Sequence, residues 1–102
     1  MNSYNSSLEN LNLATFPNIN DVITTLSSSG SYTATEDCAV IGKLVASSTL
    51  SAFCCLGLED NDYNAVAYSI AGSSCAVNIN LKKDDSILFR GSVVVLKVLR
   101  LH

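Results

Sequence analysis

The sequence predicts an all-β domain, and three observations lead to that prediction. From Ser31 onward, apolar residues recur at every second position in several short runs, which is the period of a half-buried strand. Residues that favour turns, mainly Gly, Asn, Asp and Ser, separate these runs. The connections are short, and short connections favour antiparallel pairing. We therefore expect a small antiparallel sandwich or barrel.

The first thirty residues follow a different pattern, so we divide the chain into an N-terminal anchor or stalk segment, residues 1–30, and a β domain, residues 31–102. After Pro17 the apolar residues stand at helical spacing, with Asn18 as a possible N-cap, which predicts a short helix. A helix of this length is marginal alone, so it must pack on its own domain, on sister copies or on another protein. The apolar residues expected to anchor the chain are Leu8, Leu11, Leu13, Phe16, Ile19, Val22, Ile23 and Leu26.

Six strands are expected in the β domain, separated by the turn signals SST, EDND, GSS, KKDD and RG. They are SYTATEDCAVIGKLVA (31–46), TLSAFCCLGL (49–58), NAVAYSIA (64–71), CAVNINLK (75–82), SILFR (86–90) and SVVVLKVLRL (92–101).

The last strand is apolar on both faces. Seven of the nine residues from Val93 to Leu101 are aliphatic. If Val94, Leu96 and Val98 face the core, four aliphatic side chains face outward. Leaving them in water would forgo roughly 1.5–3 kcal/mol each, which is comparable to the whole stability of a small domain. We therefore expect another copy of the chain to cover this oligomer interface, which comprises Val93, Val95, Leu99 and Leu101.

Composition argues against two classes of partner. The net charge is −3, and the six Lys and Arg residues are scattered, whereas nucleic-acid binders usually carry a basic patch. The longest apolar run is the last strand, which is far shorter than the roughly 20 residues of a membrane span. The start of the chain lacks the features of a signal peptide. We expect no nucleic-acid partner, no membrane insertion and synthesis in a cytoplasm.

No catalytic constellation is visible in the sequence. The only imidazole is that of His102 at the chain end, so no serine or cysteine has an evident base. The chain has no Gly-rich phosphate loop. Its four cysteines lie in strand-like runs and are expected to be reduced and mostly buried. We predict that the protein is not an enzyme and binds no cofactor, with hydrolysis through Asp60 or Asp62 as the less favoured alternative.

The acidic loop before the third strand is a possible ligand site. Asp60, Asp62 and Asn64 stand at alternate positions, like the start of an EF-hand loop, but Ala65 occupies the place of the required glycine. We expect a plain polar loop, with a weak calcium site shared by several chains as the alternative. Tyr63 is the best exposed aromatic for a sugar contact.

The remaining tyrosines of the β domain have a simpler interpretation. Tyr32 and Tyr68 lie within expected strands and are predicted to pack there, although each could contact a sugar.

Three segments together resemble a known family. SYTATEDCAVIGKL, AVNINLKKDDSILF and the closing aliphatic strand are similar to the small trimeric jelly-roll-like domains of bacteriophage fibres and spikes. Such domains begin with a Tyr-Thr-Ala-x-x-Asp-Gly-like turn, continue through a Lys-Lys-Gly-Asp turn and end on an apolar strand. The resemblance covers roughly residues 31–101. It departs at Cys38, where Gly is common, and at Asp84, which replaces the Gly of the second turn.

The resemblance implies a homotrimer whose β faces meet about a threefold axis. It implies a virion structural protein that is assembled in the host cytoplasm and displayed on the virion surface. The short chain suggests a head fibre or capsid decoration protein, attached to a capsid or other virion protein by its N-terminal segment. The alternative is the receptor-binding tip of a tail fibre, which would contact a host glycan through Asp60, Asp62, Tyr63 and Asn64.

Overall fold

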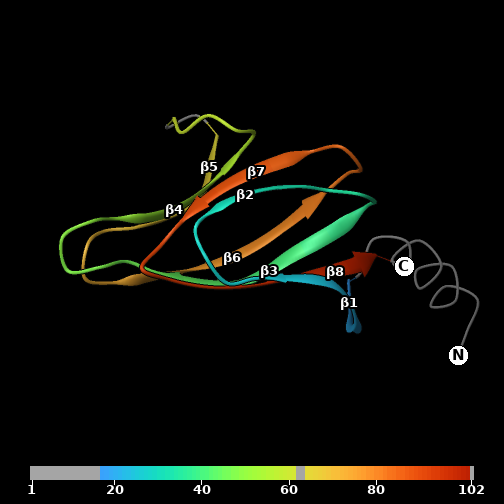
Figure 1. Ribbon diagram of the computed structural model, residues 1–102, viewed down its shortest axis with the longest axis horizontal. Coiled ribbons are helices and arrows are strands. Elements are labelled where there is room, and N and C mark those ends of the chain that lie inside the picture. The colour runs from blue at the N-terminus through green and yellow to red at the C-terminus, as the bar shows by residue number, and fades with distance from the viewer. Residues whose placement is uncertain (1–16, 62–63, 102) are drawn as a thin grey trace, which may run out of the picture.

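The computed structural model describes residues 17–61 and 64–101, with the backbone alone for residues 17–19. This part of the chain is all-β, as predicted, and contains no helix. Its eight strands are β1 Pro17–Leu26, β2 Gly30–Thr33, β3 Cys38–Val45, β4 Ala52–Leu56, β5 Ala65–Ser69, β6 Ser74–Leu81, β7 Ser86–Arg90 and β8 Val93–Leu101 (Figure 1).

The strands form two four-stranded antiparallel sheets. Sheet A has the order β1-β8-β3-β6, and sheet B has the order β2-β7-β4-β5. Strands from the two ends of the chain pair with each other: β1 with β8, β2 with β7, β3 with β6 and β4 with β5. Successive pairs alternate between the sheets, so the chain crosses from one layer to the other several times (Figure 1). The antiparallel two-layer arrangement agrees with the predicted sandwich. The strand order was not part of the prediction and comes from the structure.

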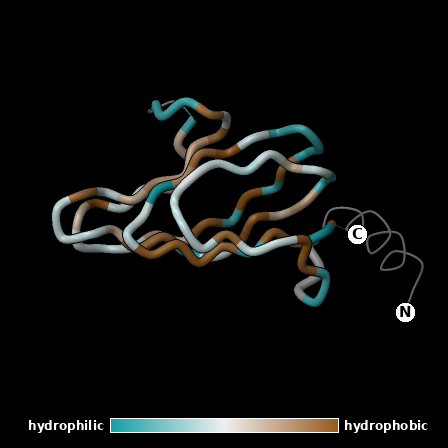
Figure 2. The backbone as a smooth tube through the Cα atoms, in the orientation of Figure 1, coloured by the Kyte–Doolittle hydropathy of each residue, from teal (hydrophilic) through white to brown (hydrophobic). Residues whose placement is uncertain are grey.

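One apolar cluster fills the space between the sheets. Alternate residues of each strand point inward, as the period of two requires, and Figure 2 shows hydrophobic segments along the strands and hydrophilic ones at several loops. Sheet A contributes side chains such as Val40, Leu44 and Leu96, and sheet B contributes Ile87 and Phe89. The interior is therefore built mainly from aliphatic side chains on strands distant in sequence.

The predicted N-terminal helix is wrong, because residues 17–26 form strand β1 and pair with β8. The register shifts between Pro17 and Val22 and again between Val22 and Thr24. These irregularities place Ile23 and Leu26 against the core, although their spacing is not that of a regular strand. The segment is also rich in β-branched residues, which favour strands. A bulged strand thus produced the spacing that suggested a helix, and residues 17–26 belong to sheet A.

The first expected strand, residues 31–46, is two strands in different sheets. β2 ends at Thr33 in sheet B, and β3 begins at Cys38 in sheet A. Ala34 is fully buried at the crossing and bonds the 82–85 turn through both backbone groups. The polar residues Thr35, Glu36 and Asp37 make the crossing, and they interrupt the alternation within the expected strand. The other five expected strands correspond to β4–β8 with shorter bounds.

Gly42 and Asp84 are two of the described positions with positive φ. A Cβ atom built on Gly42 of β3 would lie 1.9 Å from the carbonyl oxygen of Val95, so only glycine allows this approach of β3 to β8. Asp84 has φ 75° in the turn between β6 and β7. That conformation favours glycine, although Asp tolerates it better than most residues. The turn thus has a backbone shape that a glycine would adopt without strain.

Candidate functional site

The predicted oligomer interface lies on the outer face of sheet A, but only part of it is exposed. Val93 and Val95 are 48% and 47% exposed. Leu101 is half-buried, and Leu99 is only 3% exposed within the single chain. In the register of the sheet, Leu99 stands between Val22 of β1 and Ala39 of β3. The expectation that Leu99 needs a second copy to cover it is therefore wrong, because β1 is a strand of this sheet and not a separate helix.

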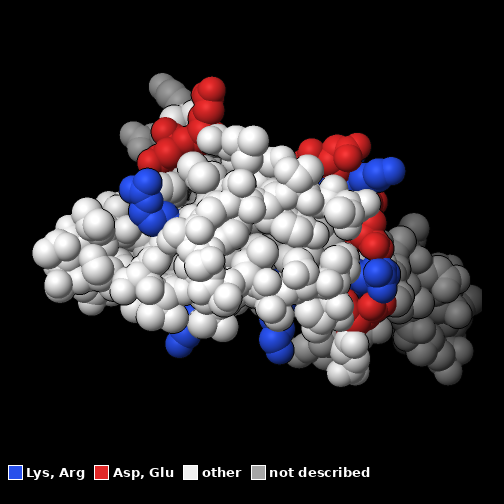
Figure 3. All heavy atoms as spheres, in the orientation of Figure 1, with Lys and Arg blue, Asp and Glu red and all other residues white. Residues whose placement is uncertain are grey.

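Two lysines share this face with the valines. Lys43 of β3 is the register partner of Val95, and Lys97 of β8 is the partner of Ile41. Both lysines are exposed, and neither has a carboxylate partner among the described residues. Figure 3 shows basic side chains along the lower edge of the domain, apart from the acidic clusters. The outer face of sheet A is thus mixed, and the contribution of Lys43 was not apparent before the register was known.

The predicted anchor residues fall into two groups. Leu8, Leu11, Leu13 and Phe16, and the side chain of Ile19, lie outside the described residues. Of the others, Val22 is 41% exposed, whereas Ile23 and Leu26 pack against the core cluster. Packing on the domain's own core, which was one of the alternatives, therefore accounts for Ile23 and Leu26.

Arg100 joins three parts of the chain at the end of β8. Its guanidinium donates to Asp21 on β1 at 2.6 Å and to both carboxylate oxygens of Glu36 at 2.6 and 3.1 Å. The hydrogen bonds from Arg100 lower the pKa of the Glu36 carboxyl below its usual value. The same contacts raise the pKa of Arg100. We interpret this cluster as a pin between β1, β8 and the β2–β3 crossing.

The predicted ligand loop is held mainly by its own polar groups. The Asn64 side-chain amide donates to the backbone carbonyls of Leu56 and Glu59, and its Oδ1 accepts from the backbone N of Asn61 at 3.3 Å. Asn64 is therefore occupied in shaping the loop. Asp60 accepts a hydrogen bond from the Cys55 thiol at 3.7 Å.

Two further facts bear on a site in this loop. Asp62 and Tyr63 lie outside the described residues. Within the described part of the chain, no group of three or more His, Cys, Asp or Glu side chains could hold a metal ion.

The outer face of sheet B carries a row of three large side chains. Phe53 of β4 is the register partner of both Tyr68 on β5 and Arg90 on β7. The Arg90 guanidinium lies 5.2 Å from the centroid of the Phe53 ring, and Phe53 is nearly buried. Tyr68 is 61% exposed, so the prediction that it packs is wrong, whereas Tyr32 does pack against the core.

The composition of β5 explains the exposure of Tyr68. The small side chains of Ala67 and Ser69 point inward, where β5 lies close to β6 of the other sheet. The larger Val66 and Tyr68 then point outward. Pattern alone favoured the reverse, because larger apolar residues usually face the core.

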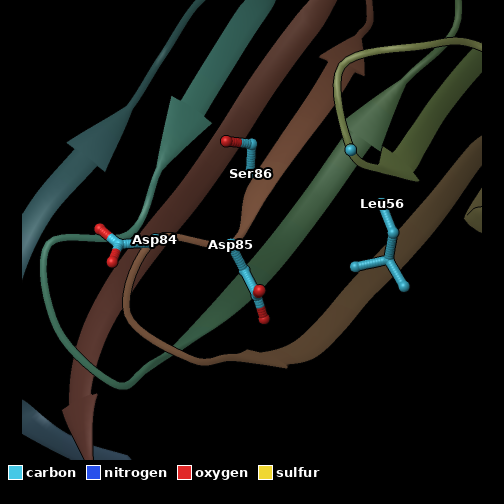
Figure 4. A pocket seen from close by; sticks show the side chains of 5 residues that line it. Leu56, Asp84, Asp85 and Ser86 are labelled. Atoms are coloured by element: carbon cyan, nitrogen blue, oxygen red, sulfur yellow. The ribbon is translucent and has the colours of Figure 1, made fainter.

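Among the hollows on the surface of the described residues, two lie beside strands of sheet B. The first, of about 300 Å³, lies between the end of β4 and the turn before β7 and is lined by Leu56, Gly57, Asp84, Asp85 and Ser86 (Figure 4). Asp84 points away from Leu56, and the Asp85 carboxylate accepts from the backbone N of Lys82 at 3.0 Å. The second, of about 190 Å³, lies beside Arg90. It is lined by Ser47, Leu50, Ser51, Arg90, Gly91 and Ser92.

The cysteines are free, as predicted. Cys38, Cys54 and Cys55 are buried, and Cys75 is half-buried. Burial raises the pKa of Cys54 to about 11. A thiol with a raised pKa carries little thiolate at neutral pH and is a poor nucleophile. These residues are therefore packing groups of the core and its margins.

Comparisons with known proteins do not assign the chain to a family. The chain matches no family model, no curated protein and no solved structure. The described part of the chain holds no helix with the length and apolarity that crossing a membrane requires.

Proposed function

We propose that this chain is a bacteriophage virion structural protein, a homotrimeric head fibre or capsid decoration protein that displays its β domain on the particle surface. The observation that carries the proposal is the outer face of sheet A, where Val93 and Val95 stay about half exposed in the single chain. Two neighbouring exposed valines on a sheet favour contact with another β surface, and a further copy is the most economical cover. The resemblance to phage fibre domains supplies the count of three.

The strand order supports a jelly-roll fold within this proposal. Pairing β1 with β8, β2 with β7, β3 with β6 and β4 with β5 is the result of rolling one long hairpin into two sheets. This arrangement is that of the eight-stranded jelly roll, which viral capsid and lectin domains use. A fold alone does not assign a function, so this support is an analogy.

In the proposed trimer, sheet A faces the threefold axis and sheet B faces outward. Val93 and Val95 meet their counterparts across the axis. Lys43 and Lys97 extend their heads toward solvent at the rim while their aliphatic stems lie over the valines. The segment before β1 attaches the trimer to the capsid or to another virion protein.

A charge placed at Val95 tests the interface. Val95→Glu should yield monomers, because each trimer would otherwise bury three unpaired carboxylates. Val66→Glu on β5 is the matched control, since Val66 is 43% exposed and lies in sheet B. Light scattering after size exclusion distinguishes the species. If Val95→Glu still forms trimers, or if Val66→Glu is monomeric while Val95→Glu is not, the interface lies elsewhere.

The location on the particle is a separate test. Gold-labelled antibodies against the β domain should decorate the capsid shell of intact virions in electron micrographs. Labelling confined to the tail tip would instead favour the second candidate function, the receptor-binding tip of a tail fibre. The observation that favours this candidate is the exposure of Tyr68 and Arg90 together on the outer face of sheet B.

A further inference from the structure

Three kinds of recognition group converge on the outer face of sheet B. We propose that this face binds an uncharged sugar chain, with Arg90 donating hydrogen bonds, Asp60 accepting them and the Tyr68 ring lying under a sugar face. These residues, together with the Phe53 ring between them, form what we call the sugar platform. It differs from the predicted ligand loop, of which it retains only Asp60. The inference concerns the purified chain and holds whatever the oligomeric state or particle location.

The register fixes the layout of the platform. Arg90, Phe53 and Tyr68 lie side by side on three adjacent strands and point to the same face. Neighbouring strands are about 4.8 Å apart, so Arg90 and Tyr68 are separated by roughly 10 Å across the Phe53 ring. A pair of linked sugar rings can span this distance, so a disaccharide can contact both ends of the row.

Arg90 has free donor groups at one end of this row. Its guanidinium rests against the Phe53 ring, which orients it. The ion pairs of the described residues are those of Arg100, and Arg90 has no carboxylate partner among them. A guanidinium has five N–H donors in a fixed fork. Arg90 can therefore donate to two neighbouring hydroxyl oxygens of a sugar without first breaking an ion pair.

Asp60 supplies the complementary acceptor. Its Oδ1 takes the hydrogen bond from Cys55, which lies two residues along β4 from Phe53 on the same outer face. A carboxylate offers about four acceptor sites, so one thiol leaves most of them available. A sugar hydroxyl both donates and accepts, which matches an Arg and an Asp on one surface. The positive charge of Arg90 and the negative charge of Asp60 offset each other, so the platform favours an uncharged sugar over an anionic one.

Tyr68 provides an aromatic surface that the chain leaves mostly uncovered. At 61% exposure on an edge strand, it presents an aromatic surface to solvent. Aromatic residues with one polar end are favoured where an apolar contact meets water. The apolar C–H face of a sugar ring can pack on such an aromatic side chain while the sugar hydroxyls stay in water.

The hollow beside Arg90 extends the platform. Ser51 and Ser92 line it and add two hydroxyl groups to the platform. Its wall is held in place, because the hydroxyl of Ser29 bonds both backbone groups of Gly91 at 3.0 Å. Its volume of about 190 Å³ is below the usual range of drug-sized pockets and suits a single ring.

A glycan array tests the proposal on the purified protein. The full chain is coupled to fluorescent beads, so that weak single-site contacts add. It is then applied to neutral hexose and N-acetylhexosamine oligosaccharides and to their uronate- and sialate-bearing counterparts. We expect binding to a subset of the neutral oligosaccharides. Binding to none of them, or only to the acidic ones, would overturn the proposal.

Point variants assign the binding to the platform. For the best neutral oligosaccharide, Arg90→Gln and Tyr68→Ala should each weaken binding by about tenfold or more in calorimetry. Ile70→Ala and Lys97→Gln are the controls, since Ile70 is 67% exposed near Tyr68 and Lys97 lies on the other sheet. Unfolding curves identify any variant that fails to fold. Full affinity in both platform variants, with the fold intact, would show that the sugar binds elsewhere.

Discussion

The outer faces of the two sheets differ in what they expose. Sheet A exposes Val93 and Val95, with Lys43 opposite Val95 and Lys97 further along β8. Sheet B presents Tyr68 and Arg90, which has no carboxylate partner among the described residues, beside an acidic loop. The exposed valines of sheet A favour contact with another sheet, whereas the donors, acceptors and aromatic ring of sheet B favour a polar ligand. The comparison suggests that one face of the sandwich associates and the other is displayed.

The largest effect is expected from the tightest contact in sheet A. Gly42→Ala would place a methyl group 1.9 Å from the Val95 carbonyl oxygen and force β3 away from β8. We expect a loss of about 3 kcal/mol or more in the free energy of unfolding, measured with urea. Gly30→Ala in sheet B is the control, because nothing lies within 4 Å of the added atom. Equal stability of the two variants would contradict the close approach of β3 and β8.

The two arginines give the next comparison. Arg100 on sheet A is bonded to Asp21 and Glu36, whereas Arg90 on sheet B has no carboxylate partner among the described residues. The pKa of Glu36 is lowered in the folded state, mainly by its hydrogen bonds from Arg100. Glu36 therefore stabilises the folded protein at pH values above its pKa in the unfolded chain, which is near 4.5. This stabilisation is lost as the pH falls through the lower pKa of Glu36 in the folded state.

This sign leads to a measurable difference between arginine variants. Arg100→Gln should lower the urea midpoint at pH 7 and reduce the loss of stability between pH 7 and pH 3. Arg90→Gln should follow the wild type at both pH values. If the stability of the two variants depends on pH in the same way, Arg100 does not hold β1, β8 and the β2–β3 crossing together.

The smallest effect is expected at the turn that joins the sheets. Asp84 lies between β6 of sheet A and β7 of sheet B with φ 75°. Asp84→Gly should raise the free energy of unfolding by up to about 1 kcal/mol, and Asp84→Ala should lower it by a similar amount. Thermal unfolding followed by circular dichroism measures both. Greater stability of the Ala variant would show that backbone strain does not govern this position.

The sequence predicted the parts of this fold that depend on local pattern. Periodicity located the strands now seen as β4 to β8, because each is short, alternating and bounded by turn residues. It failed at β1, where bulges imitate helical spacing, and after Ala34, where the polar residues Thr35, Glu36 and Asp37 carry the chain from one sheet to the other. Strand order depends on contacts between distant residues, and no local signal encodes it.

The candidate sites show the same limit. Val93 and Val95 were recognised, since alternation alone places them outside. Leu99 was misjudged because its cover comes from neighbouring strands of the sheet. In the Arg100 pin, Arg100 binds Glu36, which is 64 positions away in the sequence, and Asp21, which is 79 positions away. The row of Arg90, Phe53 and Tyr68 forms only when three strands pair in the observed register.

The most direct test of the division between an associating and a displayed face is the solution mass of the wild-type protein. Light scattering after size exclusion, with reducing agent present to keep the four cysteines free, gives that mass. We predict the mass of three chains at micromolar concentration. A stable monomer would mean that Val93 and Val95 need no partner, and it would contradict the trimer and the proposed orientation of both sheets.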